Sequence, residues 1–458
     1  MTTNTFSTLP LTPEFLANLA ALQYEEMTPI QAGSLPAIIN GKDVKAQAKT
    51  GSGKTAAFGI GLLLKLRPQQ YQTQALILCP TRELADQISK ELRRLARPIA
   101  NIKISTLCGG TPMGPQLASL EHPPHVVVGT PGRILKHSLK GTLKLNKVQT
   151  LVLDEADRML DMGFAEDILQ IIGHTPRHRQ TLLFSATYPP EIHNISATVQ
   201  IDPVDIQVES LHDSSVITQL FHEVPQGGKT AALIALLLHY HPESSVVFCN
   251  RKQQCQELTE ELRQQGFLVL ALHGDLEQKD RDQVLVQFAN KSVPLLIATD
   301  VAARGLDIKE LSAVINYELA PDPEVYVHRI GRTGRAGNTG MALSLFHASE
   351  APKVNAIARY LNQEPRFEKI PATSTEQNTL KSAMVTLCIS TGRKNKIRAG
   401  DILGALTASK ELQAQHIGKI DIFAMVSYVA VTRNEVRTAL KILGEGKVKG
   451  KKLLVRKM

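Results

Sequence analysis

The sequence is poor in cysteine and lacks any long apolar run. Five cysteines occur among 458 residues, an odd number without C-x-x-C spacing. This argues against a zinc site or a disulfide framework and favours reduced thiols in a cytosolic compartment. The longest apolar stretch, residues 231–238, is far too short to span a bilayer. Because no basic start precedes an apolar run at the N-terminus, we expect a cytoplasmic protein with no secretory signal and no membrane partner.

Charge is distributed unevenly along the chain. The whole sequence has 52 basic and 43 acidic residues, a net of +9, yet residues 372–458 alone carry 16 basic and 6 acidic residues. The part before residue 372 is therefore close to neutral, and the basic tail is typical of an appendage that binds a polyanion. A merely solubilising tail is the alternative, but TLCIS and SYVAVT within it resemble packed strands.

Short runs rich in branched apolar residues recur, separated by helical patterns such as ELADQISKELRRL. Unalternating apolar strands between helices indicate parallel sheets that are covered on both faces. In such sheets ligands bind beyond the carboxyl ends of the strands, and the unusual polar residues lie at those ends here. The runs expected to form strands are 75–80, 103–110, 125–133, 150–157, 181–187, 244–250, 268–275, 294–300, 313–318 and 341–346.

This pattern predicts an α/β protein with two tandem parallel-sheet domains and a small C-terminal α+β domain. At this length two to four domains are expected. We place the first domain at 1–210, the second at 211–370 and the third at 380–458, because polar stretches lie between them. The third part reads β-α-β-β-α-β, which is the order of a split βαβ sheet.

The stretch LVLDEADRML, residues 151–160, poses a question of charge. Its apolar start runs directly into Asp154, Glu155 and Asp157. Carboxylates so close to a buried strand cost free energy unless a positive group pairs with them. A capped helix start explains Asp157 alone but not all three, so a positive partner is expected elsewhere.

A phosphate-binding loop earlier in the sequence indicates what this positive partner is. GSGKT, residues 51–55, opens a helix, and its glycines let backbone amides approach phosphate oxygens. Lys54 would reach the outer phosphates, while Thr55 and Asp154 would bind Mg²⁺. Glu155 would position and deprotonate the attacking water. The missing positive partner is then a metal ion that arrives with ATP.

Two details qualify this loop. Its first position is Ala48 rather than glycine, a modest departure from the general pattern. A second G-K-T occurs in GGKTAAL, residues 227–233, but Glu223 stands there where the loop needs a small residue. We therefore interpret the second occurrence as an ordinary helix start.

The second half contains HRIGRTGR, residues 328–335, with four basic side chains and two glycines. Arginines presented to a γ-phosphate stabilise charge in the transition state, but the run alone is equally consistent with a solvated basic turn. Beside a phosphate loop that lacks its own arginine finger, it favours a composite ATP site between two sheets. Hydrolysis would then set the relative position of two domains.

Together these motifs resemble the DEAD-box RNA helicase family over nearly all of residues 6–346. The resemblance implies two RecA-like domains, ATP and Mg²⁺ as cofactors, RNA as partner, and local separation of RNA strands. The blocks occur in the family's order: MTPIQ (27–31), AKTGSGKT (48–55), PTREL (80–84), GG (109–110), TPGR (130–133), DEAD (154–157), SAT (185–187), QKDR (278–281), ATDVAARGLD (298–307) and HRIGRTGR (328–335).

The resemblance also implies roles around ATP. Gln31 would read adenine with Tyr24 stacked on it and Phe6 behind that loop. Met27 stands where most members have proline. The residues implied to bind ATP are Tyr24, Thr28, Gln31, Gly51, Ser52, Gly53, Lys54, Thr55, Gly305 and Asp307. The residues implied to act in catalysis are Lys54, Asp154, Glu155, Arg332 and Arg335, and those implied to couple ATP to RNA are Ser185, Thr187 and His328.

A further set is implied to grip the RNA backbone. Because phosphates and sugars carry no base identity, such a grip is indifferent to sequence. Contacts to 2′-hydroxyls let it choose RNA over DNA. The set comprises Thr81, Arg82, Gly110, Thr130 and Arg133 in the first domain, and Arg281, Thr299 and Asp300 in the second.

The basic tail resembles the C-terminal domain of the DbpA family of bacterial helicases, in LCISTGRKNKIRAGDILGALT, HIGKIDIF, SYVAV and GKVKGKKLLVRKM. The resemblance implies an RRM-like domain that recognises a hairpin of 23S ribosomal RNA during assembly of the large subunit. Only Tyr428 stands where an RRM sheet usually carries stacking aromatics, so recognition is expected to move to loops. The expected loop residues, for each of which a solvated surface position is the alternative, are Arg393, Lys394, Lys396, Arg398, Lys447, Lys449, Lys451 and Lys452.

The expected function is an RNA-stimulated ATPase that unwinds short rRNA duplexes beside a tethered hairpin, acting as a monomer. One alternative is an ATP-switched RNA clamp that binds without separating strands. Intact Glu155, SAT and finger arginines favour the helicase, although a clamp can keep all of them. A DNA helicase is disfavoured by the ordered DEAD-box set.

Overall fold

The structure is a computed structural model that describes residues 4–48, 51–188, 190–208, 217–303, 311–334, 339–372, 382–408, 411–446, 448–449 and 453–458. Its contacts group the chain into two compact units, the first running to His212 and the second occupying most of the remainder to Met458. The expected domain boundaries fall largely at 209–216 and 373–381, outside the described residues. No helix in the described ranges is both long and apolar enough to cross a membrane.

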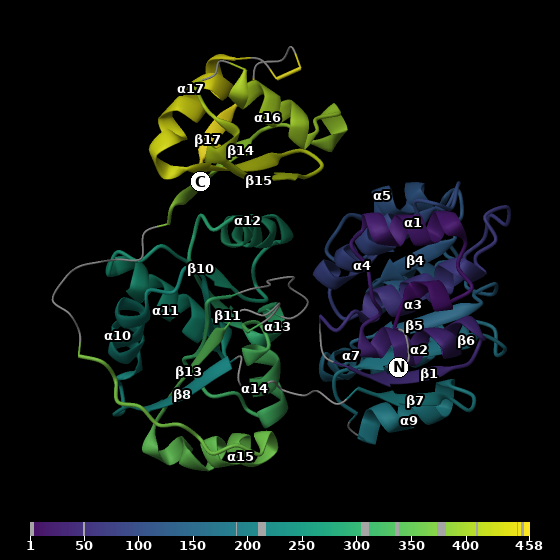
Figure 1. Cartoon of the computed structure of the whole chain (residues 1–458), viewed down its shortest axis with the longest axis horizontal. Helices are drawn as coiled ribbons and strands as arrows, with labels where there is room; N and C mark the ends of the chain where they lie inside the picture. The colour runs from purple at the N-terminus through teal and green to yellow at the C-terminus, as the bar shows by residue number, and fades with distance from the viewer. Residues whose placement is uncertain are drawn as a thin grey trace. The chain divides into compact units, whose positions relative to one another are not determined.

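The first unit is built on a seven-stranded parallel sheet (Figure 1). Across the sheet the strands lie in the order β3 (Ile104–Leu107), β4 (Val126–Gly129), β2 (Ala75–Leu78), β5 (Thr150–Asp154), β6 (Gln180–Ser185), β1 (Val44–Gln47) and β7 (Val204–Gln207). The inner strands β4, β2, β5 and β6 are buried at every position. Such burial is expected for a parallel sheet with helices on both faces.

Each face of this sheet carries its own core, because successive strand residues point to opposite faces. Ile77 and Phe184 pack with helices α1 to α4 on one face, whereas Leu76 and Leu183 pack with α5 to α9 on the other. The helices are α1 (Pro13–Ala21), α2 (Pro29–Ile39), α3 (Lys54–Lys65), α4 (Arg82–Leu95), α5 (Met113–Leu120), α6 (Pro131–Leu139), α7 (Ala156–Asp161), α8 (Ala165–Gly173) and α9 (Pro190–Val199), preceded by the short η1 (Phe6–Thr8).

The second unit repeats this plan with six parallel strands. Their order is β10 (Val269–Leu272), β11 (Leu295–Thr299), β9 (Ser245–Cys249), β12 (Ala313–Asn316), β13 (Gly340–Phe346) and β8 (Ile217–Glu223). One core lies under α10 and α11, and another lies under α14 and α15. The helices are α10 (Lys229–Tyr240), α11 (Lys252–Gln264), α12 (Gln278–Ala289), α13 (Asp300–Ala303), α14 (Pro323–Ile330), η2 (Ala348–Glu350) and α15 (Ala351–Leu361).

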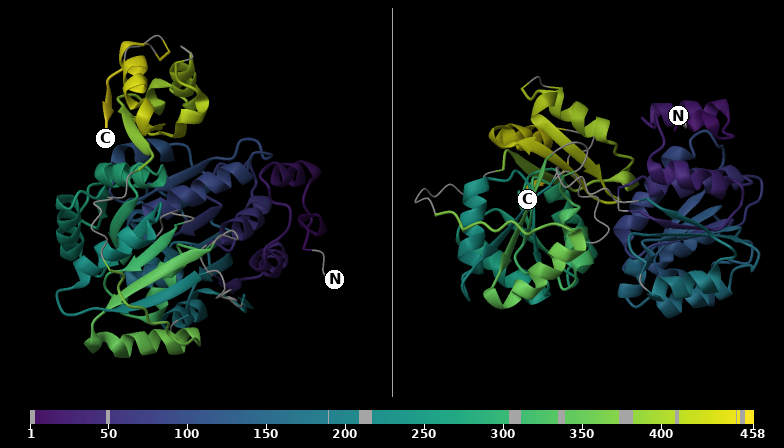
Figure 2. Two further views of the ribbon diagram at one scale, coloured as in Figure 1. Left: turned by 60° about the vertical axis from the view of Figure 1, so that its left-hand side comes forward. Right: turned by 60° about the horizontal axis from the view of Figure 1, so that its bottom comes forward.

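The tail, residues 382–458, forms a four-stranded antiparallel sheet within the second unit. Its strands lie in the order β15 (Ile417–Ile422), β16 (Ser427–Thr432), β14 (Met384–Ile389) and β17 (Val455–Lys457). Two helices, α16 (Ala399–Thr407) and α17 (Val436–Glu445), cover one face (Figure 2). The short helices are η3 (Arg393–Asn395), η4 (Ala414–His416) and η5 (Arg433–Glu435). The chain order β14-α16-β15-β16-α17-β17 confirms the predicted split βαβ arrangement and, with the two parallel sheets, the predicted fold class.

The other face of the tail sheet packs against helix α12. Cys388 and Tyr428 form an apolar cluster with Val286 of α12. Beside this cluster, Asn290 Nδ2 donates a hydrogen bond of 2.8 Å to the buried Thr386 Oγ1. The face on which an ordinary RRM stacks bases is therefore covered by the chain itself.

Candidate functional site

The loop before α3 is shaped for phosphate. Gly53, which precedes Lys54 at the helix start, has a φ of 95°, in the left-handed region that glycine tolerates. A Cβ there would lie 2.5 Å from Gln31 Nε2 and 3.0 Å from Thr28 Oγ1, so no larger residue fits. The start of this 12-residue helix concentrates backbone N–H groups and partial positive charge, which suits an anionic phosphate.

Thr28 and Gln31 brace this loop from the start of α2. The Thr28 N–H donates to Gln31 Oε1 at 2.9 Å, which closes a capping box. Thr28 Oγ1 donates to the Ser52 carbonyl at 2.8 Å, and Gln31 Nε2 donates to the Gly53 carbonyl at 3.1 Å. Thr28 and Gln31, both predicted to bind ATP, are thus bonded directly to the predicted phosphate loop.

Tyr24 lies on the chain just before this brace. Its ring meets that of Phe6 edge-on, with centroids 6.2 Å apart. The Tyr24 hydroxyl donates to Glu91 Oε1 at 2.8 Å. Met27, the departure from proline, is buried. The tyrosine is therefore held by α4, and its predicted stacking on adenine stays a prediction.

Lys54 and Asp154 form the charged centre of the first unit. The buried Lys54 ammonium donates to the Ala48 carbonyl at 2.8 Å. Asp154 ends β5 and is only 2% exposed. Burial raises the pKa of its carboxyl to about 6, with Lys54 acting in the opposite direction and Glu155 and Asp157 adding to the rise. The protein alone does not compensate this carboxylate fully.

The donors at this strand end fit a hard cation. The Asp154 carboxylate and the Thr55 hydroxyl are oxygen ligands of the kind that Mg²⁺ shares with substrate phosphates. Within the described ranges no three His, Cys, Asp or Glu side chains are grouped as a metal cage. Phosphate oxygens and waters would complete the coordination of an ion that accompanies ATP.

Glu155, the predicted base, is held by a residue that the sequence reasoning missed. Its backbone is left-handed, with φ 53° and ψ 51°. Arg158 Nη1 donates to Glu155 Oε2 at 2.8 Å, and both side chains are only 5% exposed. A basic residue three positions after a carboxylate at a helix start is the signal that points to this pair. Arg158 thus supplies part of the positive charge that the three carboxylates require.

Asp157 joins the carboxylate stretch to the SAT segment. Its Oδ2 accepts from the Thr187 hydroxyl at 3.0 Å and from the Thr187 and Ala186 N–H groups at 3.0 and 3.2 Å. Its own N–H donates to Ser185 Oγ at 3.2 Å. Ser185 and Thr187, which were predicted to couple ATP to RNA, therefore contact the segment that carries Asp154 and the base.

The residues predicted to grip RNA from the first unit gather at neighbouring strand ends. β2, β4 and β3 are adjacent in the sheet, and each ends just before one of these segments. Thr81 caps α4, and Thr130 Oγ1 accepts from the Gly109 N–H at 3.4 Å. Gly110 has a φ of 67°, and a Cβ there would overlap the Arg82 guanidinium at 1.7 Å. The sheet brings this predicted set together.

Arg133 approaches the same loop from α6. Its Nη2 donates to the Thr111 carbonyl at 3.0 Å. Its Nη1 is buried and has no hydrogen-bond partner among the residues that the structure describes. A buried N–H group without an acceptor is costly, and a phosphate oxygen is an acceptor that matches it.

In the second unit a buried guanidinium organises the predicted RNA segment. Arg329 is 1% exposed, and its Nε and Nη2 each donate to Asp300 at 2.7 Å. It also donates to Asn250 Oδ1 at 2.7 Å, Asn316 Oδ1 at 3.1 Å and the Glu318 carbonyl at 2.7 Å. The Asp300 carboxylate is therefore engaged within the unit, and its contact with RNA stays a prediction.

The other predicted residues of this unit lie close in sequence to that network. Thr299 ends β11 and is buried, and Arg281 Nη2 donates to the Ala302 carbonyl at 2.6 Å. His328 lies on α14, and the buried Arg332 follows that helix. The predicted residues outside the described ranges are Gly305, Asp307, Arg335, Lys447, Lys451 and Lys452.

In the tail, two predicted loops lie together. Lys449 Nζ donates to the Lys396 carbonyl at 2.6 Å and pairs with Asp401 Oδ2 at 3.0 Å. The Arg393 and Lys394 N–H groups bond to the turn between β15 and β16 at 2.8 and 3.0 Å. The predicted side chains exposed here are Arg393, Lys394, Lys396, Arg398 and Lys449.

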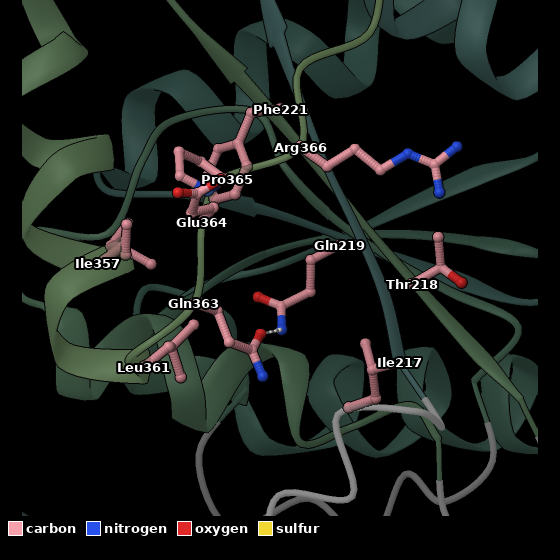
Figure 3. Close-up of a pocket in the computed structure, with 11 residues that line it drawn as sticks. Ile217, Thr218, Gln219, Phe221, Ile357, Leu361, Gln363, Glu364, Pro365 and Arg366 are labelled. Carbon is pink, nitrogen blue, oxygen red and sulfur yellow. Dashed lines mark hydrogen bonds between the residues drawn. The ribbon is translucent and has the colours of Figure 1, made fainter.

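A pocket of about 250 Å³ opens beside the first residues of β8 (Figure 3). Gln219 Nε2 donates to Gln363 Oε1 at 3.4 Å across it, while Ile217 and Leu361 contribute apolar surface. The pocket lies at the amino end of a parallel strand, whereas ligands of such sheets bind at the carboxyl ends. Among the described residues, none that was predicted to bind ATP or RNA lines it.

Three stretches match known protein families. Residues 28–195 match the DEAD/DEAH box helicase family, and residues 228–337 match the helicase conserved C-terminal domain. Residues 386–457 match the DbpA RNA binding domain. The matches fall in turn on the first parallel sheet, the second parallel sheet and the tail.

Relatives and solved structures extend these matches. The ATP-dependent RNA helicase DbpA of Escherichia coli strain K12 is 54% identical over 452 residues, 98% of this chain and 99% of that protein. The DbpA of Bacillus subtilis strain 168 is 37% identical over 476 residues, 99% of each chain. The structure of S. cerevisiae Dbp5 bound to RNA and ADP BeF3 is similar with a TM-score of 0.72 and 29% identity, over 80% of this chain and 96% of that one. The chain therefore belongs to the DbpA family of DEAD-box ATP-dependent RNA helicases.

Proposed function

We propose that this helicase unwinds short rRNA duplexes next to a 23S rRNA hairpin that its tail holds, during assembly of the large ribosomal subunit. RNA would stimulate its ATP hydrolysis. The two DbpA relatives and the match of the tail to the DbpA RNA binding domain support this proposal. We further propose that it works in the cytoplasm as a monomer, with domains at 1–210, 211–370 and 380–458.

The hairpin assignment rests on the way in which both faces of the tail sheet are covered. One face of its sheet lies under α16 and α17, and the other lies against α12. The predicted side chains Arg393, Lys394, Lys396, Arg398 and Lys449 are exposed outside the sheet and its two covering helices, and Lys449 ties the second loop to the first through the Lys396 carbonyl. Clustered lysines and arginines on a small domain suit the phosphates of a folded RNA. Docking on α12 would keep the bound hairpin at a set distance from the six-stranded parallel sheet.

For the ATP reaction we propose that the first unit holds the nucleotide. The loop 51–55 would bind its phosphates and Lys54 its outer phosphates, while Asp154 and Thr55 would hold Mg²⁺, which neutralises phosphate charge. Glu155 would act as the base on water, and Arg332 and Arg335 would supply positive charge to the γ-phosphate. The uncompensated Asp154 carboxyl, with its raised pKa, supports the metal assignment.

A strand-displacement assay tests the tethering. Two substrates share one short RNA duplex, and only one of them carries the 23S hairpin. The full chain with Arg393→Glu and Lys394→Glu is expected to unwind the hairpin substrate roughly tenfold more slowly, because phosphate contacts are lost. Arg437→Glu with Lys441→Glu, on the exposed side of α17, is the matched control and should keep the preference. An unchanged preference in the loop variant would refute the tether.

The same assay decides between a helicase and a clamp. An ATP-switched clamp would keep RNA-stimulated hydrolysis but release no strand from the hairpin-linked duplex. Displacement that requires ATP and the hairpin supports the proposal. Hydrolysis without displacement would replace it with the clamp.

A further inference from the structure

A buried polar pair lies behind the loop that carries Gly110. Gln116, on α5, is 8% exposed, and His137, on α6, is completely buried. Neither residue is in the sequence blocks that resemble the helicase family. Buried polar side chains of this kind require hydrogen-bond partners, and the partners of these two are informative.

The pair bonds to both ends of the loop. Gln116 Nε2 donates to the Cys108 carbonyl at 2.9 Å and also bonds the Thr111 hydroxyl. Since a carbonyl only accepts, the amide nitrogen must face the loop, which leaves Oε1 to accept from His137 Nε2 at 3.0 Å. His137 Nδ1 lies 2.9 Å from the Thr142 hydroxyl, which also bonds the His137 carbonyl at 3.0 Å. Burial lowers the pKa of His137, and two basic neighbours add to this effect, in agreement with a neutral ring.

The loop also meets two guanidinium groups. Gly110 lies against Arg82, so closely that a Cβ would overlap it. Arg133 Nη2 donates to the Thr111 carbonyl, and its buried Nη1 has no partner in the described ranges. The loop is thus bonded to a neutral buried pair and also contacts the arginines that we propose to grip RNA.

We infer that Gln116 and His137 are positioning residues for the RNA grip of the first unit, since they hold the loop where Gly110 and Arg133 can meet RNA phosphates. The inference rests on the proposed RNA contacts of those two residues. Loss of the pair would let the loop shift by enough to weaken several phosphate contacts together. It would leave the ATP-binding segments, which lie at other strand ends, in place.

The chain offers a matched control for this test. Gln200 is also 8% exposed, and its Nε2 donates to the Val44 and Thr181 carbonyls, each at 2.9 Å. Gln116→Met and Gln200→Met therefore remove comparable buried hydrogen bonds from one unit while keeping side-chain volume. Only the first of them has contact with the Gly110 loop.

The readout is RNA-stimulated ATP hydrolysis by the full chain. Gln116→Met is expected to raise the RNA concentration for half-maximal rate roughly tenfold, because two loop hydrogen bonds are lost. The KM for ATP and the rate without RNA should stay within about twofold. Gln200→Met should lower the melting temperature to a similar extent but leave the RNA requirement unchanged. An unchanged RNA requirement in Gln116→Met, or equal shifts in both variants, would overturn the inference.

Three further variants separate the possible failures. His137→Gln keeps a donor near the position of Nε2 and should retain most of the RNA affinity, whereas His137→Leu should not. Arg133→Ala tests the underlying RNA contact. If Arg133→Ala has no effect on the RNA requirement, the proposed contact and the inference both fail. If it weakens RNA binding and Gln116→Met does not, the positioning role alone is wrong.

Discussion

Two helices of this chain begin with the same five residues, GKTAA, at 53–57 in α3 and at 228–232 in α10. Their local structures differ. Gly53 is left-handed with a φ of 95°, whereas Gly228 has an ordinary φ of −88°. Lys54 donates to a backbone carbonyl, whereas Lys229 pairs with the Glu350 carboxylate at 2.9 Å.

The difference shows what turns a helix start into a phosphate site. Lys229 is already neutralised by Glu350, and the Thr230 hydroxyl donates to Glu261 at 2.9 Å, so both functional groups have internal partners. At α3 the lysine acts on the Asp154 carboxylate, which remains undercompensated, as its raised pKa indicates. The same pentapeptide specifies a helix start in both places, but tertiary partners decide which start can take a ligand.

The largest expected effect comes from substituting Lys54, at the start of α3. Lys54→Ala should lower RNA-stimulated ATP hydrolysis by roughly 10³-fold or more, because phosphate charge loses a preorganised partner in a buried site. Steady-state hydrolysis over a range of ATP concentrations measures this. Lys229→Ala is the matched control and should keep the rate within about threefold. A comparable loss in both variants would mean that the two starts are not functionally distinct.

The next effect concerns the base. Glu155→Gln should reduce turnover by about 10²–10⁴-fold while ATP and RNA remain bound, since the amide keeps the side chain's shape but cannot take a proton. Single-turnover hydrolysis together with RNA binding in the presence of ATP measures both properties. Glu350→Gln, at the second start, should leave turnover unchanged. Normal turnover in Glu155→Gln would contradict the assigned role.

Much of this contrast was predictable from the sequence. The apolar strand runs between helices predicted the two parallel sheets, and Glu223 before the second G-K-T predicted an ordinary helix start, which α10 confirms. The residues that pair with Lys229 and Thr230 at the start of α10 were not predictable. Glu350 lies 121 residues from Lys229, and no local pattern links them.

The same limit applies to the candidate site. Arg158 lies three residues from Glu155 and was not predicted, because a metal ion was expected as the positive partner of the carboxylates. The neutral Gln116–His137 pair has no charge or motif to mark it. The contact of Tyr428 with Val286 joins segments that are 142 residues apart, and it exists only once both have folded.

A third prediction concerns the effect of Asp154 on the free energy of unfolding. Burial raises the pKa of Asp154 from 3.8 to about 6 in the folded protein. The folded chain therefore holds a proton that the unfolded chain releases, and the free energy of unfolding falls as pH rises through this window. Asp154→Asn should stabilise the ligand-free protein by about 3 kcal/mol at pH 8.

Chemical denaturation of the ligand-free protein at several pH values measures this gain. It should shrink as pH falls below about 6 and vanish at about pH 3, where the wild-type carboxyl is protonated in both states. Lower stability of the variant at pH 8 would show that the carboxylate is already fully compensated without a ligand.

The smallest effect on the free energy of unfolding is expected for Lys229 and Glu350, at the start of α10. Its pH dependence has the opposite sign to that of Asp154. Burial alone would raise the pKa of Glu350, but Lys229, the His347 N–H and Lys353 together lower it. A lowered pKa means that the pair stabilises the fold above the ordinary pKa of 4.5 and loses this effect as pH falls through the lowered value.

Because the side chains of Lys229 and Glu350 are 10% and 21% exposed, we expect Lys229→Ala to cost about 1–2 kcal/mol at pH 7.5, less than for a fully buried pair. Most of this cost is the carboxylate left without its partner. The double variant Lys229→Ala Glu350→Gln should therefore recover part of it. Denaturation at pH 7.5 and at the lowest pH that preserves the fold measures all three proteins. A cost that grows towards low pH would show that Glu350 is not the partner that matters, and the contrast between the two helix starts would then need another cause.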